Sequence, residues 1–226
     1  GTATDWREVR CGFMHTCGLK ANGTIWCWGH GIALSPIQVG TDSDWGKIKT
    51  GENFTCALKT SGTLWCWGEN DTGQLGIGNT SNQTTPVQVG TSTNWNEINA
   101  GLGHTCGRKT DGTVWCWGQN SHGQLGNGNT TTQTSPVQVG TGTSWSEITT
   151  GWTHTCGRKA DGTLWCWGDF YLGKLGLSTA VLTDQTSPMQ VETGTNWTAV
   201  SPAAYHTCGR KSDGTLYCWG RDWEGH

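Results

Sequence analysis

Histidine and cysteine, side chains well suited to bind metals or move protons, recur in register along this chain. Histidine occupies one repeat position four times, at His15, His104, His154 and His206, and Phe54 takes that position in the remaining copy. Catalysis relies on one arranged set of groups, and a residue copied around a repeat does not provide it. Because a phenylalanine can take the place of the histidine, we predict that these histidines have a structural role. Each should pack in the fold and make one local hydrogen bond.

Ten of the eleven cysteines form pairs with nine residues between them, a spacing that suits neither zinc nor redox chemistry. Zinc sites use short CxxC knuckles or added histidines, and redox sites use CxxC. No Ser/His/Asp order, phosphate-binding glycine motif or isolated carboxylate pair stands out, so the sequence predicts no enzyme, no metal site and no cofactor. Two interpretations of the pairs remain, disulfides or reduced cysteines in a core. The pairs are Cys17 with Cys27, Cys56 with Cys66, Cys106 with Cys116, Cys156 with Cys166, and Cys208 with Cys218.

The segment between the paired cysteines favours disulfides. Each segment contains Lys-x-Asn/Asp/Ser-Gly-Thr, as at residues 20–24, which is typical of a hairpin with a three-residue loop and a left-handed glycine. Counting outward from that loop places Gly18 opposite Trp26 and Cys17 opposite Cys27. Closing such a loop is worth about 2.8 kcal/mol in the chain-entropy model.

Disulfides at this density predict an extracellular, secreted protein, because the cytosol keeps thiols reduced. Asn-x-Ser/Thr sequons are compatible with a glycoprotein, although a chain rich in Asn and Thr also generates them by chance. The seven sequons begin at Asn22, Asn53, Asn70, Asn79, Asn82, Asn129 and Asn196.

Cys11 is left without a pair. Its counterparts in the next three repeats, Thr50, Ala100 and Thr150, are small residues. Two interpretations follow, a buried free thiol or an interchain bridge.

The overall composition argues against two classes of partner. With a formal net charge of -3 and no run of Lys or Arg, the chain carries no electrostatic footprint for nucleic acid or an anionic membrane. No apolar stretch approaches the roughly 20 residues of a spanning helix, and no signal-peptide pattern opens the chain, so we expect no membrane insertion. With 16 Trp, indole must supply much of the buried area.

Five repeats with a period near fifty residues make up the chain, approximately 1–40, 41–90, 91–140, 141–192 and 193–226. Each repeat has short β-branched or aromatic segments bounded by Gly, Asn or Pro, which predicts about four antiparallel strands and no long helix. Such repeats are typical of propeller blades, so we predict a single all-β propeller domain over residues 1–226. The tryptophans predicted to pack between blades, with Tyr217 completing the last set, are Trp6, Trp45, Trp95, Trp145 and Trp197; Trp28, Trp67, Trp117, Trp167 and Trp219; and Trp26, Trp65, Trp115 and Trp165.

The motifs Gly-x-x-His-Thr, Asp-Gly-Thr-Leu-Trp-x-Trp-Gly and Asn-x-x-Gly-Gln-Leu-Gly resemble the repeat of the regulator of chromosome condensation family of β-propellers, and the resemblance covers the whole chain. It implies the propeller fold, which in that family usually has seven blades, whereas this chain supplies five repeats. The paired cysteines are an addition suited to secretion. Because the chain lacks basic character, the nucleotide-exchange activity of the founding member on a nuclear GTPase is not carried over.

Candidate ligand contacts lie where the repeat breaks. The first repeat omits the Gly-Gln-Leu-Gly loop that later repeats carry at residues 73–76 and 123–126, and the fourth repeat is longer than the others. The loop of the fourth repeat carries Phe170 and Tyr171 in place of Asn and a polar residue. Outside the repeated tryptophan positions lie Trp152 and Trp223.

The turn between Gly and His in each repeat is predicted to lie on one rim, so that five turns surround one mouth. Bacterial β-lactamase inhibitor proteins that resemble this family bind through equivalent aromatic turns, which implies Phe13, Met14, Trp152 and Tyr205 as contacts. Exposed aromatic rings suit a sugar ring or a protein anchor. The alternative is that these rings fill gaps between uneven blades.

The ring can close in more than one way. The chain holds five copies of the first three strands but four of the last, which leaves one blade short by a strand and one edge open to pairing. The interpretations are a five-bladed propeller that tolerates the gap, part of a larger propeller, or a subunit that receives a strand from its neighbour.

Two functions follow from these observations. The leading hypothesis is a secreted, non-enzymatic recognition propeller that binds an extracellular glycan or protein through one rim. The alternative is a structural subunit of an extracellular assembly or filament, a homo-oligomer with strand or disulfide exchange between chains.

Overall fold

Short antiparallel strands build the whole molecule, as predicted. The computed structural model describes residues 4–178 and 181–221, and within them it holds four four-stranded sheets and one three-stranded sheet. The first two sheets contain β1 (Trp6–Cys11), β2 (His15–Lys20), β3 (Ile25–Gly29) and β4 (Ala33–Gln38), then β5 (Trp45–Thr50), β6 (Phe54–Lys59), β7 (Leu64–Gly68) and β8 (Gln83–Gln88). The next two contain β9 (Trp95–Ala100), β10 (His104–Lys109), β11 (Val114–Gly118) and β12 (Gln133–Gln138), then β13 (Trp145–Thr150), β14 (His154–Lys159), β15 (Leu164–Gly168) and β16 (Gln185–Gln190). The last contains β17 (Trp197–Pro202), β18 (His206–Lys211) and β19 (Leu216–Gly220), and a short 3-10 turn, η1 (Tyr171–Gly173), follows β15.

The central hairpin of each sheet has the register predicted from its loop. In the first sheet Cys17 pairs with Cys27 and Gly18 with Trp26. Gly23, in the loop of that hairpin, has φ +79°, a left-handed backbone that favours glycine. The same register recurs in the other four hairpins, where each paired cysteine again lies directly opposite its partner.

All five predicted disulfides are present, and in each the two Cα atoms lie 4.1 Å apart. The alternative of reduced cysteine pairs is therefore wrong, and the disulfides indicate folding in an oxidising compartment. Among the described residues, no helix has the length and apolar character needed to cross a bilayer. The bonds join Cys17 to Cys27, Cys56 to Cys66, Cys106 to Cys116, Cys156 to Cys166, and Cys208 to Cys218.

The hydrophobic core lies at the junctions between consecutive sheets. At the first junction the Cys17–Cys27 disulfide packs against Trp45 and Ile48 of the second sheet, and the next three junctions repeat this arrangement. Members of all three predicted tryptophan sets pack at these junctions, and those of the third set, Trp65, Trp115 and Trp165, are partly buried there. The third set is half-buried at the hairpin end, where each indole covers a lysine; the ammonium of Lys109 lies 4.3 Å from the ring centroid of Trp115.

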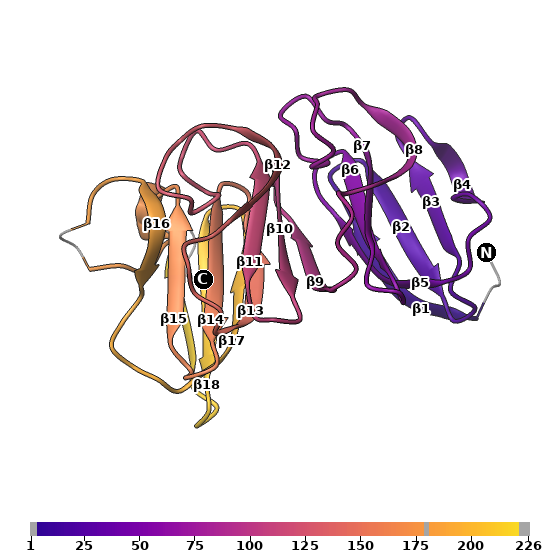
Figure 1. Cartoon of the computed structure of the whole chain (residues 1–226). Helices are drawn as coiled ribbons and strands as arrows, with labels where there is room; N and C mark the ends of the chain where they lie inside the picture. Colours follow the sequence, from indigo (N-terminus) through magenta and orange to yellow (C-terminus); the bar gives the residue numbers. More distant parts are fainter. Residues whose placement is uncertain (1–3, 179–180, 222–226) are drawn as a thin grey trace.

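The sheets follow one another in chain order, from the indigo first sheet to the yellow last sheet (Figure 1). Strand packing links each sheet to the next, through the pairs β2 and β5, β6 and β9, β10 and β13, and β14 and β17. The two outer faces of this series are uncovered among the described residues: Val9 is 46% exposed, whereas its counterpart Ile48 is 0% exposed, and Leu216 is 69% exposed, whereas Leu164 is 0% exposed. The described chain is therefore an open arc of five sheets.

Candidate functional site

The five predicted turns line one mouth on the inner side of the arc. The turns that join the first and second strands of all five sheets line a pocket of 370 Å³. Neighbouring turns are linked by backbone hydrogen bonds, from Phe13 N to Glu52 O (2.9 Å), from Leu102 N to Trp152 O (3.3 Å) and from Trp152 N to Ala203 O (3.3 Å). These bonds join the first turn to the second, and the third turn to the fourth and fifth.

Charged side chains lie on the innermost strands beneath this mouth. Arg10 pairs with Glu8 at 2.6 Å on β1. On β5, burial lowers the pKa of Lys49, and the nearby Arg10 charge lowers it further. On β13, burial raises the pKa of Glu147, against the hydrogen bond from Arg158. Glu8 and Glu147 of these inner strands are thus each paired with an arginine.

Two predicted contact residues meet on the rim. The rings of Trp152 and Tyr205 lie 5.5 Å apart, edge to face, with the side chains 40% and 37% exposed. Tyr205 also lies beneath two cations, 5.1 Å from the Arg221 guanidinium carbon and 6.0 Å from Lys174 Nζ. Because ring contacts restrict the rotamers of both aromatic side chains, the pair presents a preorganised aromatic surface.

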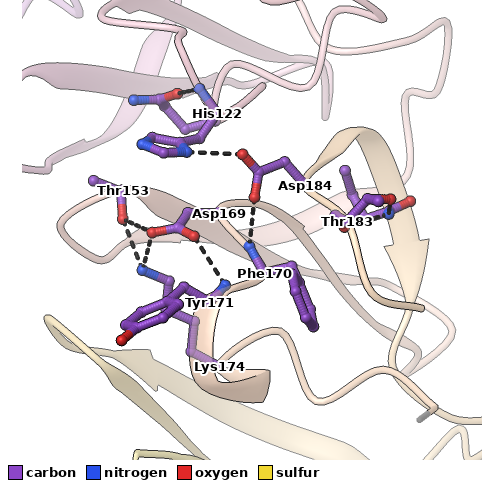
Figure 2. Close-up of polar contacts among 10 residues, drawn as sticks. His122, Thr153, Asp169, Phe170, Tyr171, Lys174, Thr183 and Asp184 are labelled. Atoms are coloured by element: carbon purple, nitrogen blue, oxygen red, sulfur yellow. Dashed lines mark hydrogen bonds and ion pairs between the residues drawn. The ribbon is translucent and has the colours of Figure 1, made fainter. Parts of the chain in front are cut away.

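A buried lysine beside this pair was not expected from the sequence. Lys174 takes the place of Gln74 and Gln124 of the preceding repeats, and its side chain is only 1% exposed. Its Nζ donates to Asp169 Oδ2 at 2.5 Å and to Thr153 Oγ1 at 2.8 Å (Figure 2). A buried charge requires such a partner, so the lysine and the aspartate depend on each other.

The hydrogen bonds around Asp169 keep its carboxylate ionised. Burial raises the pKa of this carboxyl, but donation from Lys174, the Tyr171 N–H and Thr153 outweighs burial, and the pKa lies below its usual value. Tyr171 N donates at 2.9 Å. The Lys174–Asp169 pair is thus a fixed polar base for the loop that follows β15.

His122, Asp169 and Asp184 form the one His/Cys/Asp/Glu group, among the described residues, whose ligand atoms all lie within 4.8 Å of one another. His122 Nδ1 lies 2.8 Å from Asp184 Oδ2, and Asp184 Oδ1 accepts from Phe170 N at 3.0 Å (Figure 2). Every carboxylate oxygen here already accepts from a protein donor. We interpret the group as a hydrogen-bonded network in which His122 and Asp184 tie the loop of the third sheet to that of the fourth.

His15, His104 and His154 have the predicted structural role, since each ring lies within hydrogen-bond distance of a threonine of the next sheet. His104 Nε2 lies 3.0 Å from Thr155 Oγ1 of the next sheet, and that hydroxyl donates to Gln124 O at 2.8 Å. Since the hydroxyl proton is directed to the carbonyl, Nε2 must be the donor, and the ring is the neutral tautomer. Burial lowers the pKa of both His104 and His154 to about 3, with the Lys174 charge adding to the effect at His154.

Of the other predicted contact residues, one lines the same mouth as Trp152 and the rest lie elsewhere. Phe13 is exposed and lines the mouth, whereas Met14 is exposed and lines a second pocket, between the first two sheets. Phe170 packs against the core of the fourth junction, while Tyr171 is exposed on η1. Trp223 lies outside the described residues.

Two predictions about single residues need separate comment. Cys11 is an exposed free thiol beside the mouth, so the expectation of a buried thiol is wrong; the mouth that its small counterparts line is open to solvent. The Asn70 sequon is inaccessible, because its amide is fully buried and donates to Asn79 O and Ser81 O. The other six sequon asparagines are exposed and remain predicted glycosylation sites.

Comparison with known proteins identifies the repeat. Residues 61–107, 111–157 and 161–209 match the model of the regulator of chromosome condensation (RCC1) repeat. A second model of the same repeat matches residues 6–31, 47–74, 95–124, 145–173 and 204–222. Among curated proteins, no significant match was found.

Solved structures with the same fold include three propellers. Yeast RCC1 (Prp20) bound to Kap60 is 21% identical, with a TM-score of 0.82 over 96% of this chain and 56% of the yeast chain. Human WBSCR16 is 22% identical, with a TM-score of 0.80 over 94% of this chain and 59% of the human chain. The CRINKLY WD40 ectodomain of the Arabidopsis thaliana receptor kinase ACR4 is 21% identical, with a TM-score of 0.59 over 95% of this chain and 63% of its own. The chain thus spans little more than half the length of the first two, and at these identities the likeness is one of fold.

Proposed function

Since the chain belongs to the regulator of chromosome condensation (RCC1) repeat family, we propose that it is a secreted, non-enzymatic recognition propeller that binds an extracellular protein or glycan through one rim. The observation that most supports this proposal is the Trp152–Tyr205 pair. The two rings are partly exposed on the rim and are restrained by their contact with each other. Trp, Tyr and Arg are the residues enriched among binding hot spots, and Arg221 lies over the Tyr205 ring.

The hydrogen bonds between turns of the rim support this role. Binding costs less free energy when the contact side chains are ordered beforehand. The turn-to-turn hydrogen bonds restrain the backbone of the turns they join, and the Lys174–Asp169 pair supports the loop beneath Tyr205. The disulfides support a role outside the cytosol, as the sequence predicted.

The proposal is tested by screening the purified chain on a glycan array and on an array of secreted proteins. Replacement of Trp152 or Tyr205 with Ala should weaken binding to any hit by about tenfold or more. The matched control is Tyr217→Ala, a comparably exposed aromatic ring at the hairpin end of the same sheet as Tyr205. Binding that survives both rim substitutions would remove this rim as the contact surface, and the array carrying the hit distinguishes a glycan from a protein.

A second candidate function, the subunit of an extracellular assembly, is favoured by the uncovered outer faces of the arc. Val9 and Leu216 are exposed where their counterparts are buried, and the Cys11 thiol is exposed. Sedimentation over a range of concentrations tests association, which Leu216→Glu should weaken. Non-reducing gels of Cys11→Ser test disulfide exchange, and oligomers that remain unchanged in this variant would discard it.

A further inference from the structure

Three of the four junctions between sheets are filled by one loop of the preceding sheet. In each, a single backbone carbonyl of that loop accepts two hydrogen bonds from the next sheet, at about the same distances. Gln74 O accepts from Trp117 Nε1 (3.0 Å) and Thr105 Oγ1 (2.8 Å), Gln124 O from Trp167 Nε1 (3.0 Å) and Thr155 Oγ1 (2.8 Å), and Lys174 O from Trp219 Nε1 (3.0 Å) and Thr207 Oγ1 (2.8 Å).

The residue after that carbonyl is a leucine whose side chain fills the junction. Leu75, Leu125 and Leu175 are 0% to 1% exposed and belong to the junction cores. The glycines on either side allow the loop to approach the next sheet closely. Gly73 and Gly76 have φ +76° and +72°, and a Cβ on Gly76 would lie 2.5 Å from the Trp117 indole nitrogen.

The first junction has no such loop. The connection from β3 to β4 is only residues 30–32, and a pocket of 640 Å³ opens between the first two sheets. The lining of this pocket matches the surface that the loop contacts at the second junction. Asn53, Thr55, Trp67, Gly68, Gln83 and Thr84 line it, and their counterparts Gly103, Thr105, Trp117, Gly118, Gln133 and Thr134 contact the loop of the second repeat.

The first junction has the same two donor groups as the others, the Trp67 indole and the Thr55 hydroxyl. Both line this pocket, where no loop of the first sheet supplies a carbonyl oxygen. Thr55 Oγ1 lies 2.9 Å from His15 Nε2, and its counterparts at the filled junctions, Thr105 and Thr155, donate to a loop carbonyl. The nearest other partner is Cys17 Sγ at 3.5 Å, a weak acceptor. The Trp67 indole is 7% exposed, whereas Trp117 and Trp167 are 0% exposed. Both donors thus lie where the other junctions supply a carbonyl oxygen.

We propose that the first junction is a binding site for a Gly-x-Leu-Gly turn presented by a partner protein. The turn would place a carbonyl oxygen against Trp67 Nε1 and Thr55 Oγ1, and its leucine side chain between the two sheets. A backbone N–H of the turn would donate to Thr84 O, as Gly78 N donates to Thr134 O at 2.8 Å. This peptide site lies apart from the Trp152–Tyr205 pair and goes beyond the rim function proposed above.

Charge at the pocket sets a preference among such turns. Glu69 and Asp71 line the wall formed by the second sheet. Like charges repel at close range, so basic residues flanking the turn should be preferred over acidic ones, and this preference should weaken as salt is raised.

A cyclised peptide of this protein's own loop, residues 70–79, provides the probe. It is titrated into the full chain labelled with ¹⁵N at tryptophan, and we expect a saturable shift of the Trp67 indole N–H signal. The same peptide with its leucine changed to alanine should bind about tenfold more weakly or worse, because the leucine fills the apolar part of the site. Trp67→Phe and Thr55→Val should each weaken binding about three- to tenfold, through loss of one hydrogen bond. Trp117→Phe, at a junction that is already filled, is the matched control and should leave binding unchanged.

A grafted variant tests the site without removing any pocket residue. Replacement of residues 30–32 with residues 69–82 would fill the first junction from within the chain. This graft should raise the melting temperature and abolish peptide binding. The proposal is overturned if the leucine and alanine peptides bind equally, if the peptide leaves the Trp67 signal unmoved, or if the graft binds the peptide as the unmodified chain does. A glycan that competes for the Trp67 signal while the peptide does not would assign the pocket to a sugar.

Discussion

The first and third junctions of the arc have the same core residue types, but the third is filled by a loop and the first holds a pocket. Both pair a buried disulfide with a tryptophan and an isoleucine of the next sheet. The third junction is completed by Leu125 and its loop, whereas the first lacks the loop and keeps an open pocket. In both junctions the disulfide packs directly against the next sheet, so the missing loop of the first junction leaves a pocket beside that contact.

The largest difference should come from the leucine that fills the third junction. Leu125→Ala should lower the free energy of unfolding by about 2–5 kcal/mol, because it opens a cavity in a close-packed core. Leu34→Ala in the first repeat removes a fully exposed side chain and should change the free energy by less than about 0.5 kcal/mol. Chemical denaturation with the disulfides intact measures both, and equal effects would contradict the contrast between a filled and an open junction.

Acidification should also separate the two junctions. The pKa of His104 is about 3 in the folded chain because burial disfavours the charged ring, so the unfolded chain takes up the proton first as pH falls below about 6.5. Stability should therefore fall between pH 7 and pH 5, by about 2 kcal/mol from this ring, and go on falling towards pH 3.

His104→Phe, which copies the Phe54 of the second repeat, should remove the contribution of that ring to the pH dependence, while the contribution of His154 remains. Burial also lowers the pKa of His15, but the backbone hydrogen bond with Glu52 acts in the opposite direction. His15→Phe should consequently flatten the profile less than His104→Phe. Denaturation of both variants at pH 7 and pH 5 checks this order, and a larger effect at His15 would reverse the account of which junction is more enclosed.

The smallest difference concerns one indole hydrogen bond. Trp117→Phe leaves Gln74 O with Thr105 as its remaining donor and should cost about 1–3 kcal/mol of stability. Among the described residues, no loop carbonyl lies against the Trp67 indole N–H. Trp67→Phe should therefore lower the stability less than Trp117→Phe does. Thermal melting of the two variants, side by side, gives the ordering; a larger loss at Trp67 would mean that its indole already has a partner.

Local features of this fold could be predicted from the sequence because they depend on neighbouring residues. The loop at residues 20–24 sets the hairpin register, and the register places Cys17 against Cys27. The grouping of the turns at one mouth was also predictable, since every repeat places its turn at the same end.

Features that depend on contacts between sheets could not be predicted in the same way. The omitted loop was visible in the first repeat, but the pocket depends on Trp67 and Thr55 of the second. The Lys174–Asp169 pair could not be predicted, because burial of the lysine depends on the packing around it in the folded chain. Of the two interpretations of Cys11, the buried free thiol is wrong because this residue is exposed and lines an open mouth, and the interchain bridge remains a prediction.

Hydrogen exchange of the tryptophan indole N–H groups tests the central claim most directly. The claim is that one junction is open while the next three are closed by a loop carbonyl. Trp117 and Trp167 should exchange slowly, because their N–H groups are buried and bonded to Gln74 O and Gln124 O. Trp67 should exchange orders of magnitude faster in the free protein and become protected when a Gly-x-Leu-Gly peptide is added. Protection of Trp67 equal to that of Trp117 in the free protein would contradict the account.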